Sequence, residues 1–456
     1  MPDPTIRTQP TEAVPLPPAA VDAVLPPGET SPRSALFIVF LVVFIDLLGF
    51  GIVLPLLPRY GEAYVAALVP GGKEARAGGA ILGLLMASFS FMQFLVAPVW
   101  GRISDRVGRR PILLVGLAGS VVFYTLFGYA SDLPASPRHL AALALALIFV
   151  ARIGAGVAGA TISTAQAVIA DCTPPERRKH GMALIGAAFG IGFTFGPLVG
   201  FASLLWFPEH HRVIGYTAAG LSFLALVLGL VLLPETRRFG TAPPLERRWF
   251  DGRAFHTVLR TPAIAPVVLI FFLATLGFGS FEPTLALLLK DAMHLSETNS
   301  FLVFAYVGFV LVMTQGFLYR RLAHRYTEPT FMAAGITLMA LGLFLLGGVS
   351  WLAFRGMPAA GAETLWVCLL VSLALAVVGF ALLAPSAQAL ISRRSDPAQQ
   401  GEVLGVNQSA NALSRILGPV AGVGLYYLSP THFLPYVFSV GLLVAVMLLT
   451  LRVRRA

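Results

Sequence analysis

The sequence ALFIVFLVVFIDLLGFGIVLPLLP, residues 35–58, is the stretch that decides the fold. It is apolar over a length sufficient to cross a bilayer as a helix, and it contains one acidic residue, Asp46. About 10 residues at 1.5 Å each separate Asp46 from the start of the segment, which places it roughly 15 Å deep in a hydrocarbon core ~30 Å thick. A carboxylate there costs about 2.5 to 3.5 kcal/mol, so we expect it to face a protein interior or a watery cavity.

The glycine and proline pattern around Asp46 returns in the second half of the chain. Gly49–Pro55, GFGIVLP, is matched by Gly277–Pro283, GFGSFEP. Two further pairs of stretches repeat in a common register: TAQAVI and SAQALI, beginning at Thr164 and Ser386, and GPLVG and GPVAG, beginning at Gly196 and Gly418. The chain therefore consists of two duplicated halves.

Composition indicates a polytopic membrane protein. Hydrophobic residues make up 57% of the 456 positions and charged residues 12%, and the mean hydropathy is +0.80. The net charge of +10 does not indicate nucleic-acid binding, because the basic residues lie between apolar spans and form no basic face on a soluble domain. The two cysteines, Cys172 and Cys368, have no paired or metal-ligand spacing, and the sequence indicates neither a metal site nor a cofactor.

Twelve apolar segments are long enough to cross a bilayer. The first six are residues 35–58, 79–100, 111–130, 140–170, 181–206 and 214–233, and the second six are 263–289, 299–319, 330–350, 364–391, 402–428 and 433–451. These spans predict a disordered tail over 1–34, an N-terminal bundle over 35–233, a linker over 234–262 and a C-terminal bundle over 263–456. Lys and Arg gather in the loops on the side of the N-terminus, which predicts that both termini are cytoplasmic.

The expected fold is therefore an all-α polytopic membrane protein with twelve transmembrane helices in two pseudo-symmetric six-helix bundles. Two such halves that face each other across a central cavity are typical of transporters whose substrate site lies near the bilayer midplane.

The loop between the second and third spans reads GRISDRVGRRP, Gly101–Pro111. Gly101 is expected to let two helices approach and Gly108 to allow a sharp turn. Asp105 is expected to pair with an arginine or to cap a helix, and the arginines place the loop in the cytoplasm.

This loop matches the signature G-x-x-x-D-R-x-G-R-R of the major facilitator superfamily at Gly101, Asp105, Arg106, Gly108, Arg109 and Arg110. The chain resembles that family from the first span onward. The resemblance implies that the loop locks one conformation through charge pairs, in a network with Asp171, Glu176 and Arg177 after the fourth span. It also implies a functional monomer.

Three stretches resemble one branch of the family, the twelve-span drug:proton antiporters that include tetracycline-resistance pumps. Residues 46–55 are similar to the first-span signature of that branch. Residues 192–200, GFTFGPLVG, are similar to its fifth-span antiporter motif at Gly192, Gly196, Pro197 and Gly200, although Phe201 stands where a final glycine is usual. Arg152 with Gly156 resembles its fourth-span signature, although Ala155 replaces the usual glutamine.

Four ionisable residues lie inside the predicted spans: Asp46, Arg152, Glu282 and Arg415. Asp46 is the candidate proton carrier, because the proton affinity of a carboxylate depends on its burial and on nearby arginines. The alternative is a structural acid that caps a neighbouring helix. Arg152 is expected to hold or release that acid, and Glu282 is either a second proton or cation site or a structural hydrogen-bonding group.

The eleventh span carries Asn407, Asn411 and Arg415 on one helical face, flanked by Gln408. We expect this face to look onto the cavity and to form a mixed polar and aromatic pocket with Gln166, Gln388, Phe278 and Phe281. Contacts between helices are the competing explanation for the amides.

The leading functional hypothesis is a proton-driven exporter of small amphipathic or drug-like molecules in the bacterial inner membrane. Its partners are then a small-molecule substrate, protons and the lipid bilayer, without nucleic acid. A symporter or facilitator for a metabolite such as a sugar or an organic anion is the second hypothesis, favoured by Arg152 and Arg415. A membrane enzyme that acts on lipids and a receptor that does not transport are the alternatives from other classes.

Overall fold

The computed structural model describes residues 32–70, 76–173, 178–208, 210–236, 260–355, 361–395 and 400–455, together with residues 256 and 258. All its elements are helical: α1 (Pro32–Val53), α2 (Leu57–Leu68), α3 (Arg76–Val107), α4 (Arg109–Ser131), α5 (Arg138–Gly159), α6 (Ile162–Cys172), α7 (Arg178–Trp206), α8 (Arg212–Leu232), α10 (Ala265–Asp291), α11 (Glu297–Met313), η3 (Thr314–Tyr319), α12 (Arg320–Leu322), α13 (Glu328–Arg355), α14 (Ala362–Arg394), α15 (Gln400–Tyr426) and α16 (Leu434–Arg455). Almost all of the predicted tail and most of the predicted linker lie outside the described residues.

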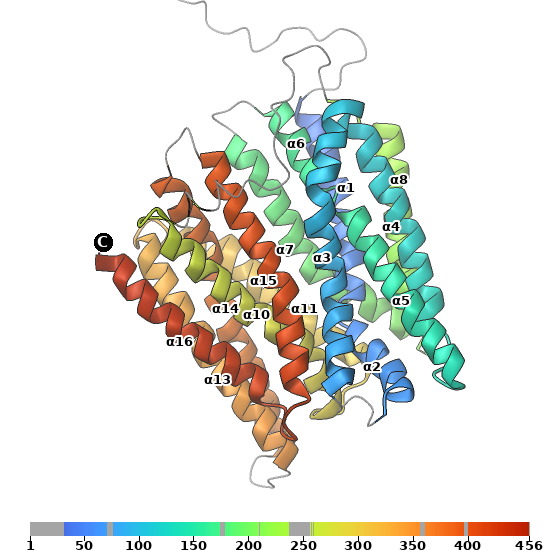
Figure 1. The fold of residues 1–456 in the computed structure, drawn as a ribbon. Helices are drawn as coiled ribbons and strands as arrows, with labels where there is room; N and C mark the ends of the chain where they lie inside the picture. The colour runs from blue at the N-terminus through green and yellow to red at the C-terminus, as the bar shows by residue number, and fades with distance from the viewer. Residues whose placement is uncertain are drawn as a thin grey trace, which may run out of the picture.

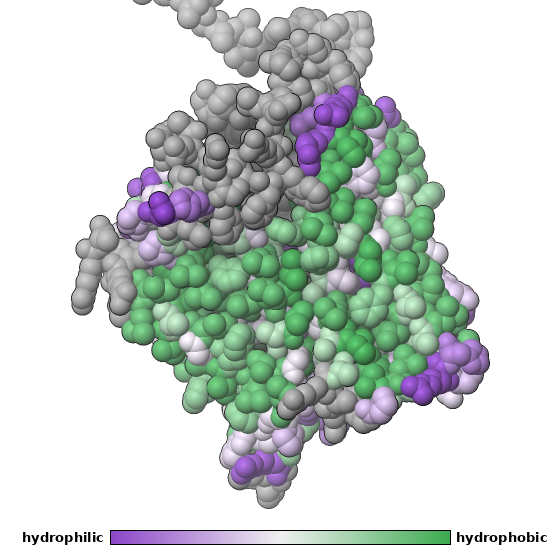
Figure 2. Space-filling model, in the orientation of Figure 1, coloured by the Kyte–Doolittle hydropathy of each residue, from purple (hydrophilic) through white to green (hydrophobic). Residues whose placement is uncertain are grey.

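The predicted spans correspond one by one to a helix or to consecutive helices, so the all-helical transmembrane fold is confirmed. Nine helices in the described part of the chain are long and apolar enough to cross a bilayer, and α7 and α16 contribute shorter apolar stretches. The remaining span, α15, is more polar because it carries Asn407, Asn411 and Arg415. Figure 2 shows hydrophobic side chains across the middle of the visible face and hydrophilic ones at both ends.

Three predicted spans are interrupted. The first ends as α1 at Val53, and the chain turns before α2 begins at Leu57, because Pro55 has no N–H to continue the helical ladder. The fourth is divided at Ala160 and Thr161 into α5 and α6. The eighth continues from α11 into the π-helix η3.

The duplication is visible in how the helices cross. In the N-terminal half α1 packs on α7, and a Cβ at Gly196 would stand 2.9 Å from the backbone carbon of Gly51. In the C-terminal half α10 packs on α15, and a Cβ at Gly418 would stand 2.8 Å from the backbone carbon of Gly279. Both pairs are related by the sequence repeats, so glycine permits the same close crossing in each half.

The two halves meet through α3 against α15 and through α7 against α11 (Figure 1). A Cβ at Gly83 would stand 2.9 Å from the Cα of Val420, and a Cβ at Gly308 would stand 2.6 Å from the Cα of Thr194. Backbone thus approaches backbone across the interface at both contacts.

The bundle has two ends. The α2 end carries α2, the start of α8 and the end of α10, and it lies towards the bottom of Figure 1. The Gly108 end is opposite and carries the turn between α3 and α4.

Candidate functional site

Asp46 on α1 is partly exposed and lines a small cavity. The cavity is lined by Asp46, Leu47, Phe50, Phe89, Gln93, Ser120, Tyr124, Ala155, Gly159, Ile162 and Arg415. The expectation that Asp46 faces an opening rather than lipid agrees with this position.

Hydroxyl groups surround the Asp46 carboxyl on its bundle side. Ser120 on α4 and Ser222 on α8 lie near it, and both serines are buried. Tyr124, one helical turn after Ser120, is also buried and interacts electrostatically with Asp46. In the described part of the chain, Asp46 Oδ1 has no hydrogen-bond partner. This buried oxygen can therefore carry a proton.

Arg152 on α5 is 2% exposed and does not pair with Asp46. No carboxylate among the described residues lies within 4.0 Å of its guanidinium, and Nε and Nη1 have no hydrogen-bond partner there. The guanidinium carbon lies instead 4.7 Å from the ring centroid of Phe89 and 5.9 Å from that of Phe50. Cation–π contacts of this kind contribute about 0.5 to 2 kcal/mol. Tyr124 interacts electrostatically with both Asp46 and Arg152.

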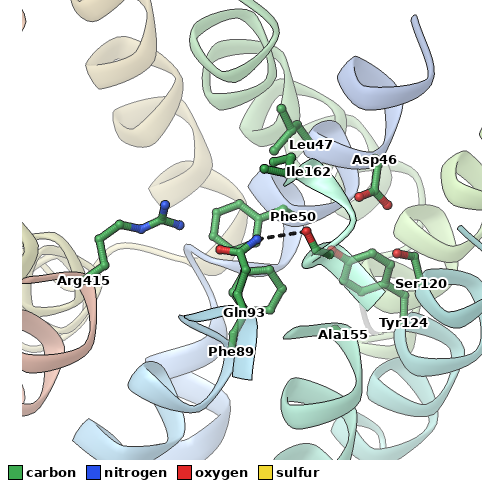
Figure 3. A pocket seen from close by; sticks show the side chains of 11 residues that line it. Asp46, Leu47, Phe50, Phe89, Gln93, Ser120, Tyr124, Ala155, Ile162 and Arg415 are labelled. Carbon is green, nitrogen blue, oxygen red and sulfur yellow. Dashed lines mark hydrogen bonds between the residues drawn. The ribbon is translucent and has the colours of Figure 1, made fainter. Parts of the chain in front are cut away.

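The C-terminal half contributes Arg415 to the same cavity. In Figure 3 Arg415 on α15 stands across the cavity from Asp46, with Phe50 and Gln93 between them. Arg415 also interacts electrostatically with Glu282 on α10, and both side chains are partly buried. The cavity therefore receives a carboxylate from one half and a guanidinium from the other.

Of the eight residues predicted to form a substrate pocket, only Arg415 is among the described residues that line the Asp46 cavity. Gln166 is partly buried, and Gln388 and Gln408 are exposed. Asn407 is 1% exposed, and within the described residues neither its Oδ1 nor that of Asn411 has a hydrogen-bond partner.

The two predicted aromatic pocket residues belong to the packing of the C-terminal half. Phe278 stacks on Phe380 with 4.1 Å between ring centroids. Phe281 is 1% exposed and meets Phe278 edge to face at 4.9 Å. In this conformation the ring of Phe281 is covered by neighbouring side chains.

The loop at the Gly108 end is held by charge pairs around Arg109. Its guanidinium contacts Asp105 at 2.6 Å and Asp171 at 3.2 Å, so the predicted network includes both acids. Gly108 has a φ of +114°, a backbone conformation that favours glycine. No described atom lies within 4 Å of a Cβ placed at Gly101, so the expected close approach of helices at Gly101 is not seen here. Arg106 is exposed, and the remaining members of the predicted network, Glu176 and Arg177, lie outside the described residues.

Glu235, just after α8, completes this loop and was not predicted. Its carboxylate accepts hydrogen bonds from the backbone N–H groups of Arg109 at 2.9 Å and Arg110 at 3.1 Å. An acidic group at a helix N-terminus satisfies free N–H donors and is favoured by the helix dipole. Glu235 therefore fixes the start of α4 to the end of α8.

The fifth-span motif lies on α7 and contributes to packing along its length. Besides the crossing at Gly196, a Cβ at Gly192 would stand 3.1 Å from Cβ of Leu47, the neighbour of Asp46. A Cβ at Gly200 would meet the ring of Phe301 in the other half at 2.6 Å, and Pro197 lies inside the helix.

Gln93, Ser120 and Tyr124 are cavity residues that the sequence analysis missed. Gln93 on α3 donates a hydrogen bond from Nε2 to the backbone oxygen of Gly159 at 3.1 Å. An amide inside an apolar span was a usable signal, because such groups are costly in lipid. The serine and the tyrosine gave no comparable signal, since both residue types are common in helices that pack against others.

The comparisons with known proteins extend over most of the chain. The Major Facilitator Superfamily model matches residues 39–362 and 267–456. Tetracycline resistance protein, class C, from Escherichia coli is 30% identical over 411 residues, which cover 90% of this chain and 94% of that protein.

Solved structures agree with the fold. The crystal structure of the human organic anion transporter MFSD10 has a TM-score of 0.63 and 26% identity, and the match covers 92% of this chain and 100% of that one. The D-xylose-proton symporter has a TM-score of 0.73 over 92% of this chain and 97% of that one, and at 17% identity this likeness shows the fold alone.

Proposed function

Because this chain belongs to the Major Facilitator Superfamily of membrane transporters, we propose that it exports small amphipathic molecules in exchange for protons. It is a transporter and not an enzyme, since its relatives and structural neighbours are transporters of this family. The similarity to tetracycline resistance proteins supports export.

The position of Asp46 carries the proposal. It is an acidic group in the interior of a transmembrane helix, it lines a cavity, and one of its oxygens has no partner among the described residues. A charged residue inside the membrane is costly and is typical of ion and substrate pathways. In this proposal Asp46 takes up a proton when the cavity opens to one side and releases it when the cavity opens to the other.

Proton and substrate then compete for the same cavity. A substrate that enters between Asp46 and Arg415 displaces the proton from Asp46, and a returning proton displaces the substrate. Arg152 keeps a fixed positive charge behind the rings of Phe50 and Phe89 and favours the ionised carboxylate at a distance. Inward flow of protons drives outward flow of the substrate.

The cavity indicates the chemistry of that substrate. Phe50, Phe89 and Tyr124 supply aromatic surface, and Arg415 supplies a cation that attracts an anionic group. An aromatic molecule with an acidic group fits this arrangement. The similarity to the human organic anion transporter MFSD10 supports the same class.

The two bundles over residues 35–233 and 263–456 are proposed to rock against each other as rigid bodies, joined by the linker over 234–262. The chain is proposed to lie in the bacterial inner membrane with both termini in the cytoplasm. The loop at the Gly108 end then faces the cytoplasm, and the α2 end faces outward. A functional monomer is also proposed, as the family resemblance implies.

The test is the direction of proton movement in liposomes that contain the purified protein and a luminal pH dye. Tetracycline or an aromatic sulfonate is added outside at equal pH on both sides. An antiporter releases luminal protons as the probe enters, so the luminal pH rises. We expect Asp46→Asn to abolish this signal and Asp132→Asn, at the surface-exposed end of α4, to preserve it.

Two results would contradict the proposal. Asp46→Asn vesicles with proton movement equal to that of the unaltered protein would remove Asp46 from the mechanism. A fall in luminal pH on probe addition would identify a symporter, the second candidate function, which Arg415 and Arg152 favour for an anionic metabolite.

A further inference from the structure

Polar side chains of α2 join the two halves at the α2 end. Arg59 is 5% exposed, and backbone oxygens of the other half accept hydrogen bonds from its guanidinium. Its Nε donates to the oxygen of Ala286 at 3.3 Å, and its Nη2 donates to that of Leu295 at 3.0 Å. The hydroxyl of Tyr60 donates to Glu297 at 3.2 Å. All three acceptors belong to α10, to the loop after it or to the start of α11, so each bond crosses from the N-terminal to the C-terminal half.

Glu62, one turn after Arg59, forms a salt bridge with Lys290 near the end of α10. The Glu62 side chain is 2% exposed and that of Lys290 is 40% exposed. The two residues are 228 positions apart, the same separation as between the GFGIVLP and GFGSFEP repeats. Glu62 and Lys290 therefore occupy equivalent positions in the two halves.

This equivalence restricts when the pair can form. Equivalent residues of two duplicated halves are related by the pseudo-two-fold axis between the halves, so they touch only on that axis. Contact requires both halves to lean towards the axis at the α2 end. Identical charges at such a position would repel, whereas the duplicated chain carries an acid in one half and a base in the other.

We propose that Glu62 and Lys290, supported by Arg59, form a latch that holds the halves together at the α2 end and opens when they separate there. The proposal does not depend on which substrate the cavity accepts. A buried carboxylate is costly to desolvate, so the pair adds little net stability while it is complete. Replacement of Lys290 removes the salt-bridge partner of the buried Glu62 carboxylate and favours separation of the halves, where that carboxylate regains water. Replacement of Glu62 removes the attraction of Lys290 across the halves.

The latch lies at the ends of the segments that carry the candidate coupling acids. Glu62 follows α1, which carries Asp46, and Lys290 lies eight residues after Glu282 on α10. Eight residues correspond to about 12 Å along a helix. A tilt of α10 that repositions Glu282 therefore also repositions Lys290.

Charge reversal tests the pair directly. Spin labels at the exposed positions Ala67 on α2 and Asn299 on α11 report the separation of the halves by double electron–electron resonance in lipid nanodiscs. The labelled protein has both native cysteines replaced by serine. We expect Glu62→Lys and Lys290→Glu each to raise the ratio of open to closed molecules by about tenfold or more. The double reversal, which restores an opposite pair at equivalent positions, should return the distances to those of the unaltered protein.

Arg355→Glu is the matched control, because Arg355 is exposed and its guanidinium carbon lies 4.5 Å from the Trp351 ring centroid, within the C-terminal half. It should leave the distance distribution unchanged. Lys290→Met replaces the base without adding a charge and should also open the α2 end, so the result does not depend on the reversed variants alone. Unchanged distances in both single reversals would overturn the latch. A double reversal as open as the single ones would overturn the pairing of Glu62 with Lys290.

Discussion

The two halves of the molecule share a packing scheme and differ in their charges. The Gly51–Gly196 crossing of α1 with α7 is repeated by the Gly279–Gly418 crossing of α10 with α15. In the register of the GFGIVLP and GFGSFEP repeats, the position equivalent to Asp46 is Ala274. Duplication has therefore preserved how the helices pack, while the acid that lines the cavity exists in one half only.

The arginines differ in the same way. In the register of the GPLVG and GPVAG repeats, Ala374 is equivalent to Arg152, and Phe193 is equivalent to Arg415. Arg152 is enclosed by aromatic rings, whereas Arg415 lines the cavity. The N-terminal half thus supplies the acid and a shielded charge to this region, and the C-terminal half supplies the positive charge that lines the cavity.

The largest expected effect distinguishes the role of Asp46 from that of Glu282. Asp46→Asn should abolish proton-coupled transport, whereas Glu282→Gln should preserve coupling and raise the apparent affinity for an anionic probe by about tenfold or less, because the Arg415 guanidinium loses a competing carboxylate. Proton flux in liposomes measures both effects. Equal loss of coupling in the two variants would remove the functional difference between the halves.

The shared packing predicts similar losses of stability in both halves. A valine at Gly196 or at Gly418 places side-chain atoms against the backbone of the facing helix, which should cost about 1 to 3 kcal/mol and lower the unfolding temperature in detergent. Gly220→Val and Gly441→Val are the controls, because no described atom lies within 4 Å of a Cβ at either position. An effect at one crossing and none at the other would show that the packing has diverged as well.

Arg415→Gln tests whether Arg415, unlike the shielded Arg152, attracts the acidic group of a probe. It should raise the half-saturating concentration of an aromatic sulfonate about tenfold and leave that of an uncharged aromatic probe within about twofold, because the guanidinium attracts the acidic group. Transport at varied probe concentrations measures this effect. Equal weakening of both probes would indicate that Arg415 shapes the cavity and does not select charge.

The smallest expected effect is a pH dependence of the contact between His211 and Glu297, which joins the halves at the α2 end. His211 lies 3.1 Å from Glu297, and this hydrogen bond raises the pKa of His211 above its ordinary 6.5, while burial opposes the shift. Three further groups face this site. They are Asp132, Arg212, which pairs with Asp132, and the ring of Tyr60, whose centroid lies 5.3 Å from that of the His211 ring. The protonated histidine therefore stabilises closure fully below pH 6.5, and this contribution is lost as the pH rises through the raised pKa.

We expect the closed fraction to fall by at most about fivefold between pH 6 and pH 8, since a partly exposed pair contributes under ~1 kcal/mol. The spin-label pair on α2 and α11 measures this fraction. His211→Gln should flatten the pH dependence, and a dependence that persists in this variant would assign it to another group.

The sequence predicted the helices well and the cavity poorly. Apolar length and the repeats identified the spans, because a lipid-exposed backbone must satisfy its own hydrogen bonds as a helix. The spacing of Asn407, Asn411 and Arg415 predicted a polar face on α15. Spacing does not predict which residues of other helices contact each side chain. Of these three, Arg415 lines the Asp46 cavity.

Residue spacing also could not predict the partners of the charged residues inside the membrane. Depth along the helices left pairing of Asp46 with Arg152 open, and the structure places Arg152 against Phe89 and Phe50 instead. Glu62 and Lys290 sat in stretches interpreted only as loop or span end, although the repeat that makes them equivalent was already present in the sequence.

The amino-acid sequence is sufficient to identify this protein as a duplicated helical bundle in a membrane. It also shows a few charged residues inside the spans, whose cost in lipid indicates a role. Hydrophobic length, glycine spacing and the repeat are properties of the chain alone, because each depends on neighbours close in sequence. Only the tertiary structure decided which charges share a cavity, which are enclosed by aromatic rings and which join the halves. Those contacts link residues on different helices, far apart in the chain, and their geometry follows from how the helices cross.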